Sequence, residues 1–186
     1  KAMIRRELQE HKWAFVYLPW IVAAFMSLVV VLVYLGLTEV NTENFNFSTE
    51  IYSNPDLIKA MQESTFEQRR EAIRAGLLVL GSPLVIALGF ALLAFSLSTF
   101  FDERKDKSII FWRSLPVSDS YTVFSKLLVV TVVAPLLVIP ALLFLHLVSV
   151  TAGSVFFAVS DLFPFTWAWQ AYPWFDWIRL IFSLWL

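Results

Sequence analysis

The sequence contains no cysteine, and its five glycines, at positions 36, 76, 81, 89 and 153, are scattered along the chain. Without cysteine there is no disulfide, no thiolate nucleophile and no cysteine-based zinc or iron–sulfur site. The glycine spacing excludes the G-x-x-x-x-G-K-[ST] loop that cradles nucleotide phosphates, and H-E-x-x-H does not occur either. We therefore expect a protein that is not an enzyme and binds no cofactor itself.

Charge is also sparse, since 16% of the residues are charged and 59% are hydrophobic. Soluble domains are about one-quarter charged, so this composition is typical of a membrane protein. Crossing the hydrocarbon layer takes about 20 apolar residues in a helix. We predict an all-α, polytopic transmembrane helical bundle with spans at 13–37, 75–101 and 121–150. The apolar run at 177–186 predicts the start of a fourth span in a truncated chain.

Polar segments separate these runs. Residues 1–12 place their apolar side chains near one face, which predicts an amphipathic helix in the membrane interface, acting either as a basic anchor or as a docking element. Residues 38–74 predict a partly helical loop, with helix starts at Pro55 and at Ser64-Thr65-Phe66-Glu67. Residues 151–176 are crowded with aromatic rings, which indicates a loop in the headgroup layer; an aromatic platform for a substrate is the alternative.

The distribution of basic residues predicts the orientation. Four precede the first span and five lie between 104 and 126, whereas 151–176 has none. Lys and Arg concentrate in cytoplasmic loops. We therefore place the amino terminus and residues 102–120 in the cytoplasm, and 38–74 and 151–176 outside.

Few polar side chains lie inside the spans. His146 is the only titratable one deep in a complete span, which makes it a functional candidate. Its plainer interpretation is a hydrogen bond to a neighbouring helix or to interfacial water. Ser82 and Ser96 are candidates for a pathway, although serines in membrane helices more often serve close packing.

Residues 102–120 form a polar island between the second and third spans. Charged residues at 102–107 end the second span in water, and 108–115 supply one or two helical turns. Pro116 disfavours helix just before it, and Ser118 is suited to cap the third span. The island is thus predicted to be a stiff connection between two membrane helices.

The apolar turn of the island ends in Phe111, Trp112 and Arg113. Aromatic residues and arginine are enriched at interface hot spots, so this turn is a candidate contact for a cytosolic partner. The alternative is an interfacial loop whose rings rest among the headgroups while its basic residues follow the positive-inside bias.

The run FDERKDKSIIFWRSLPVSDSYTVFSKLL resembles the segment between the second and third spans of ABC-2 type exporter permeases. The family pattern is a glutamate, an apolar turn, L-P-[VL]-S and a lysine, which correspond to Glu103, 108–111, 115–118 and Lys126. The opening RREL with EHKW is similar to the amphipathic helix with which that family begins.

The resemblance implies a six-span permease of a bacterial cytoplasmic (inner) membrane, of which this chain is the amino-terminal half. It would pair with a second permease subunit as a homo- or heterodimer. Two cytosolic ABC ATPase subunits would bind ATP and Mg²⁺, and no nucleic acid partner is expected. The alternative is a membrane scaffold that recruits a cytosolic partner without transport. The implied ATPase-coupling residues are Glu103, Arg104, Lys107, Ile110, Phe111, Trp112, Arg113, Leu115 and Pro116. The implied interfacial helix carries Arg5, Arg6, Glu7 and Leu8.

Lys107→Cys and Ser160→Cys test the orientation, because each would be the only cysteine in the chain. We expect a membrane-impermeant thiol reagent to label position 160 in intact cells, and position 107 only after the cells are permeabilised. Labelling of position 107 in intact cells would reverse the predicted topology.

Overall fold

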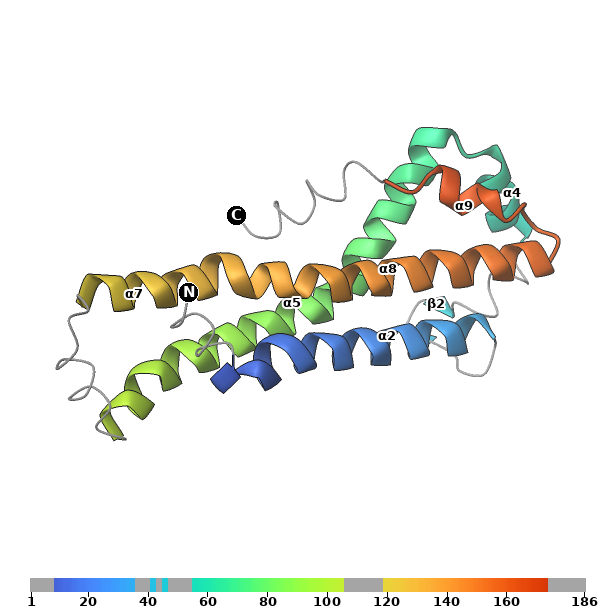
Figure 1. Ribbon diagram of the computed structural model, residues 1–186. Coiled ribbons are helices and arrows are strands. Elements are labelled where there is room, and N and C mark those ends of the chain that lie inside the picture. Colours follow the sequence, from blue (N-terminus) through green and yellow to red (C-terminus); the bar gives the residue numbers. More distant parts are fainter. Residues whose placement is uncertain (1–8, 36–40, 43–44, 47–54, 106–118, 174–186) are drawn as a thin grey trace. The chain divides into compact units, whose positions relative to one another are not determined.

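The computed structural model describes residues 9–35, 41–42, 45–46, 55–105 and 119–173 (Figure 1). These residues are helical apart from turns, short connections and one antiparallel pair of two-residue strands. In chain order the elements are η1 (Trp13–Tyr17), α2 (Leu18–Tyr34), β1 (Asn41–Thr42), β2 (Phe45–Asn46), α4 (Pro55–Glu63), α5 (Phe66–Lys105), α7 (Asp119–Leu128), η2 (Val129–Val133), α8 (Ala134–Val159) and α9 (Thr166–Gln170).

Three helical stretches among the described residues are long and apolar enough to cross a membrane: Trp13–Tyr34, Phe66–Ser98 and Val123–Val159. The prediction of a polytopic all-α membrane protein is confirmed to this extent. The predicted fourth span, at 177–186, lies outside the described residues.

The chain divides into two compact units, and α2, α5 and α8 each contribute residues to both. Unit 1 comprises Lys1–Val22 and Pro83–Leu142, and unit 2 comprises Ala23–Ser82 and Leu143–Leu186. Each unit has its own buried side chains, so we describe each by itself.

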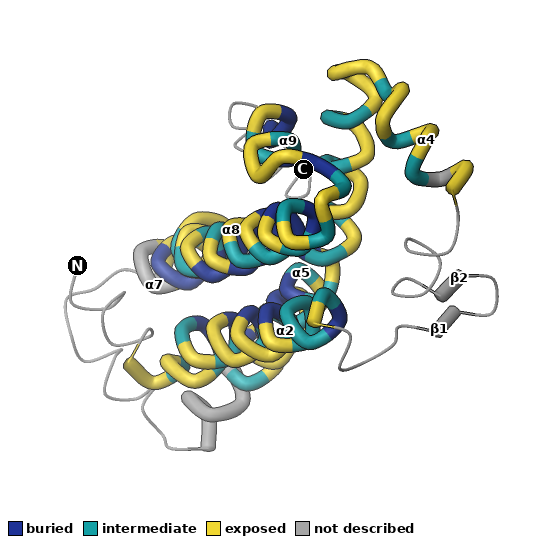
Figure 2. Tube along the Cα trace, turned by 90° about the vertical axis from the view of Figure 1, so that its right-hand side faces the viewer, coloured by how far each residue is buried: buried dark blue, intermediate teal, exposed yellow. Residues whose placement is uncertain are grey.

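Unit 1 is packed around aromatic and small apolar side chains. Phe15 is fully buried, and its ring lies edge-on to that of Phe95, with 5.3 Å between the centroids. Val129, Ala134 and Ala141 are also fully buried. Many of the exposed residues of the same helices, coloured yellow on the tube of Figure 2, are large and apolar. Such extensive apolar exposure is typical of a surface that faces lipid.

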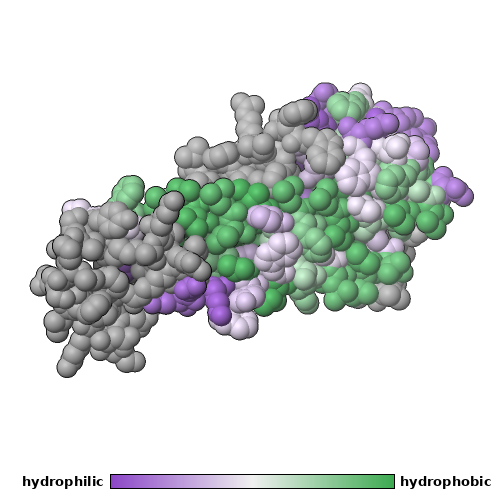
Figure 3. All heavy atoms as spheres, in the orientation of Figure 1, coloured by the Kyte–Doolittle hydropathy of each residue, from purple (hydrophilic) through white to green (hydrophobic). Residues whose placement is uncertain are grey.

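Unit 2 contains the other parts of the long helices together with α4 and α9. Leu77 in α5 and Leu145 in α8 belong to its core, as do the small residues Ser149, Gly153 and Ser154. Small residues let membrane helices approach closely. Figure 3 shows hydrophilic residues gathered over α4 and the first turns of α5, whereas the long helices present a hydrophobic surface. Unit 2 therefore includes both a membrane-embedded part and a polar, solvated part.

Pro19 and Pro135 each follow a π-helical turn, η1 and η2 respectively. A proline ring lacks an N–H and clashes with the carbonyl four residues earlier in an ordinary α-helix. In both places the residue after the π turn donates its N–H to the carbonyl five residues earlier, which widens the helix just ahead of the proline. These bonds run from Leu18 to Trp13 and from Ala134 to Val129.

The capping box at the start of α5 begins one residue later than predicted, at Thr65 instead of Ser64. The Thr65 hydroxyl accepts a hydrogen bond from the Gln68 N–H at 3.3 Å, and the Gln68 side chain accepts one from the Thr65 N–H at 2.9 Å. This reciprocal pair is a capping box with Thr65 as its first residue. Ser64, the predicted cap, instead donates to the Met61 carbonyl at the end of α4. The predicted register was wrong because either hydroxyl satisfies the sequence pattern.

The end of α8 also differs from the prediction, which began an irregular aromatic loop at residue 151. The helix continues through Val159. Asp161 then adopts a left-handed conformation with φ 54°, and the Leu162 N–H donates to the Phe157 carbonyl at 3.1 Å. This is a Schellman termination. No proline occurs between 151 and 159, so the helix runs on until the cap at Asp161.

Thr65→Ala is expected to destabilise the first turn of α5 by about 1 kcal/mol, because the side-chain cap is lost. Hydrogen exchange of the amides at 67–69 measures this, since local opening sets the exchange rate. Ser64→Ala is the matched control and should leave these amides as protected as before. Equal loss of protection in both variants would contradict the assignment of the cap to Thr65.

Candidate functional site

The polar island is held at both ends by helices that continue from membrane spans. The candidate span Phe66–Ser98 belongs to α5, which runs on to Lys105. On the other side α7 begins at Asp119, and the candidate span Val123–Val159 starts within this helix. The predicted helix start next to Ser118 is thereby confirmed for the described residues.

The predicted coupling residues are only partly described. Glu103 and Arg104 lie in the last turn of α5, and the structure describes their backbone alone. The other coupling residues fall at 107–116, and the predicted interfacial residues at 5–8; both ranges lie outside the described residues.

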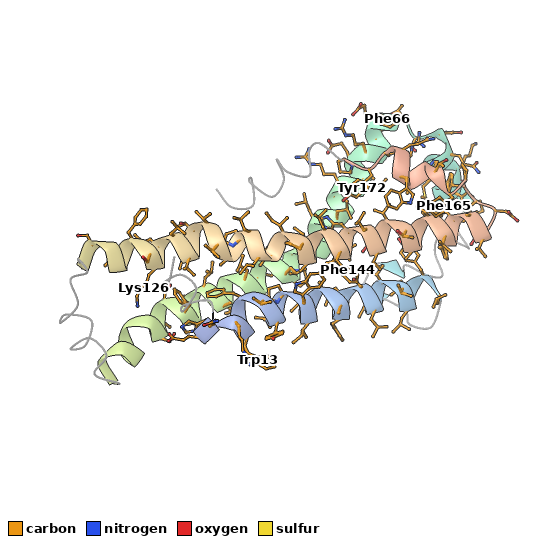
Figure 4. All side chains as sticks on the ribbon, in the orientation of Figure 1. Trp13, Phe66, Lys126, Phe144, Phe165 and Tyr172 are labelled. Carbon is orange, nitrogen blue, oxygen red and sulfur yellow. The ribbon has the colours of Figure 1, made fainter. Side chains whose placement is uncertain are left out.

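Lys126, the lysine that matches the family pattern, is buried in α7 with 8% of its surface exposed (Figure 4). Its neighbours Val123, Phe124 and Leu127 are exposed. Lys126 therefore lies on the packed face of α7, together with Ser125. Its position on the cytoplasmic side stays a prediction.

An aromatic contact joins the segment before the first span to α5, within unit 1. The His11 ring lies edge-on to the Phe95 ring, with 4.9 Å between the centroids. Phe15, one turn after His11, contacts the same ring. Sequence analysis did not single out His11, although its spacing from Phe15 places both on one helical face. His11 and Phe15, at the start of the described part of the chain, are therefore packed against α5. The contact lies near the end of α5 that leads into the island.

His146 is a structural residue in this geometry. It is buried in α8, and its Nε2 lies 3.1 Å from the Leu77 carbonyl oxygen in α5. A carbonyl only accepts, so Nε2 carries the hydrogen and donates it. The plainer of the two predictions, a hydrogen bond to a neighbouring helix, is thus confirmed.

Ser82 and Ser96 both donate to their own helix. The Ser82 hydroxyl is 2.7 Å from the Val79 carbonyl, and the Ser96 hydroxyl is 2.8 Å from the Leu92 carbonyl. Val79 is four residues before Pro83, which lies inside α5, so its carbonyl lacks the usual N–H partner. Ser82 therefore supplies the hydrogen bond that the proline removes, a role that favours the structural interpretation over a pathway.

A second cluster lies in unit 2, where the segment after α8 folds over the start of α5. The rings of Phe163 and Trp167 stack at 4.5 Å, and Phe157 meets both edge-on. The Arg69 guanidinium lies 5.1 Å from the Trp167 ring centre, within cation–π range. The Arg69 Nε is buried and has no hydrogen-bond partner among the described residues. No signal in the sequence pairs Arg69 with Trp167, because the two are far apart along the chain.

Tyr172 closes the same segment and is almost fully buried. Burial raises the pKa of its phenol to about 12, so the side chain stays protonated at physiological pH. Among the described residues, no three His, Asp or Glu side chains come together in a way that could hold a metal ion. The interactions within the cluster are ring stacking, edge-on ring contacts and the cation–π contact.

No protein-family model, curated protein or solved structure matches the chain. The likeness to ABC-2 type exporter permeases is accordingly carried by the residues of the island and of the opening RREL.

His146→Leu is expected to lower the free energy of unfolding by about 1 kcal/mol, in the range measured for hydrogen bonds between membrane helices. Thermal unfolding in detergent measures the change. Ser149→Ala is the matched control, because the Ser149 hydroxyl bonds only within α8, to the Leu145 carbonyl at 2.7 Å, and should cost less. His146→Gln keeps an N–H donor and should recover part of the loss. If Gln behaves no better than Leu, the bond to Leu77 is not what His146 contributes.

Proposed function

We propose that this chain is the transmembrane permease subunit of an ATP-binding cassette exporter of the ABC-2 type. It forms the substrate pathway with a second permease subunit in a bacterial inner membrane. ATP and Mg²⁺ are bound and hydrolysed by separate cytosolic subunits. The supporting observation is the island with Leu115-Pro116-Val117-Ser118, set between two helices that continue without a break into membrane spans.

The helical ends make the island a suitable lever. A helix transmits a displacement along its axis because each turn is hydrogen-bonded to the next. α5 is one helix from Phe66 to Lys105, with the carbonyl exposed by Pro83 satisfied by Ser82. Force applied to the island would therefore reach the membrane part of α5 instead of being absorbed by a loop.

The contact between His11 and Phe95 supports a second route. It ties the segment that follows the predicted interfacial helix to α5, seven residues before the polar island residue Asp102. A movement of the amino-terminal helix in the plane of the membrane would then act on the same helix as the island. In this proposal both cytoplasmic elements converge on α5.

The proposed cycle begins when ATP closes the two nucleotide-binding subunits. Phe111, Trp112 and Arg113 are the contact edge that moves with them, since residues of these types dominate many interfaces. The displacement of α5 and α7 then switches the pathway between the two permease subunits. Transport and ATP hydrolysis are coupled because the same movement accompanies both.

Trp112→Ala tests this proposal. Loss of the aromatic anchor should remove at least about 2 kcal/mol of contact energy, as is typical of a hot-spot residue. We expect transport and its stimulation of ATP hydrolysis to fall, while membrane insertion stays normal. The assay measures ATPase activity and transport of the complex assembled with its cytosolic subunits in vesicles.

Phe124→Ala is the matched control, because Phe124 is a large aromatic on α7 that is exposed and lies within an apolar span. It should leave coupling unchanged. Charge reversal at Glu103 and Arg113 should act as Trp112→Ala does. Normal coupling in all the island variants would contradict the lever, and binding of a cytosolic partner without any transport would favour a scaffold.

A further inference from the structure

Unit 2 contains an open apolar groove between α2 and α8, with a volume of about 720 Å³. Phe144, labelled in Figure 4, lies on the side of α8 toward α2. The groove follows one face of α8 from Phe144 to Ser160, roughly four turns, or about 24 Å at 1.5 Å per residue. Its shape suits an extended molecule better than a compact one.

The lining of this groove is almost entirely hydrocarbon. Leu35, Leu147, Val155 and Val159 are exposed along it. The Thr151 hydroxyl is turned to its own helix, where it donates to the Leu147 carbonyl at 2.6 Å. A ligand in the groove therefore finds apolar contacts along most of its length.

Tyr34 forms part of the lining and is held in place by two features of α8. Its hydroxyl lies over Gly153, where an added Cβ would be only 3.0 Å from the oxygen. Its ring also contacts Phe156, with 5.3 Å between the centroids. Because the helices pack closely here, the groove has a fixed wall.

The groove differs from a surface prepared for another helix. Membrane helices associate closely through small residues. In this part of α8 the small residues Ser149, Gly153 and Ser154 are already buried. The groove face carries bulky side chains such as Phe144 around the smaller Ala152, and the space between them suits a flexible chain.

We propose that this groove binds one acyl chain of a bilayer phospholipid. Both walls belong to helices that are long and apolar enough to span a membrane, so the surrounding medium is lipid. An acyl chain matches the groove in its apolar chemistry and its extended form. The site is independent of the proposed transport function, because it requires neither the island nor an ATPase.

A phosphatidylethanolamine with a photoactivatable diazirine in its acyl chain tests the proposal. The full chain is reconstituted in vesicles of phosphatidylethanolamine and phosphatidylglycerol, irradiated, extracted into detergent and mapped by mass spectrometry. We expect labelling at residues 144–160 to exceed that around Val79, an exposed residue of α5 outside the groove, several-fold. Equal labelling of the two regions would overturn the site, because it would mean general contact with the bilayer.

Ala152→Trp fills the groove and should reduce its labelling several-fold, whereas Val79→Trp, the matched control, should not. Val155→Trp is a second filling variant whose exposed position at the groove tolerates a large side chain. Unchanged labelling in correctly inserted Ala152→Trp or Val155→Trp would contradict the proposal. Val155→Cys examines the competing occupant: a disulfide-linked dimer formed through it would show that a second copy of the chain covers the groove instead.

These measurements need no cytosolic subunit. A failure of acyl-chain binding would leave the coupling experiment on Trp112 untouched, and a failure of coupling would leave the lipid site in place.

Discussion

Backbone hydrogen bonding in hydrocarbon is the constraint on which the described structure depends. A membrane interior offers no water to a carbonyl or an amide, so every such group needs a partner within the protein. Four prolines, at 19, 83, 135 and 140, lie in the membrane helices and each removes one donor. At three of them the helix continues by one of two devices: π turns ahead of Pro19 and Pro135, and the Ser82 hydroxyl that donates to the Val79 carbonyl four residues before Pro83.

The same constraint explains the behaviour of several polar side chains in the spans. A hydroxyl in a membrane helix finds its nearest acceptor in the preceding turn of its own backbone. Four hydroxyls donate to the carbonyl four residues earlier in this way, those of Ser96, Thr131, Ser149 and Thr151. His146 is longer and reaches across to Leu77 in another helix. These residues therefore hold the shape and association of the helices, and polarity within a span is weak evidence here for a transport pathway.

The two proposals draw on different parts of the molecule. Coupling relies on unit 1, where α5 and α7 enter the island and His11 packs on Phe95. Acyl-chain binding relies on unit 2, where α2 and α8 enclose the groove. Both proposed roles require rigidity: a lever must resist bending, and a groove must keep its width when it is empty. The continuous helices resist bending, and the close contact of Tyr34 with Gly153 fixes the width of the groove.

The sequence by itself determined that this is a membrane protein, and it located the three membrane helices and the island. The length and hydropathy of an apolar run and the charges beside it are local properties of the chain. The sequence also located helix starts at Pro55 and close to residue 65, since caps depend on a few adjacent residues. The cap predicted at Ser64 lies at Thr65, and the third helix, predicted to end at residue 150, ends at Val159. Both boundaries depend on which of several possible hydrogen bonds forms. Only the tertiary structure decided the partners of His146, Arg69 and His11, the burial of Lys126, and the groove of unit 2. Each of these depends on which residues meet across helices, and contacts between distant residues leave no periodicity in a single sequence.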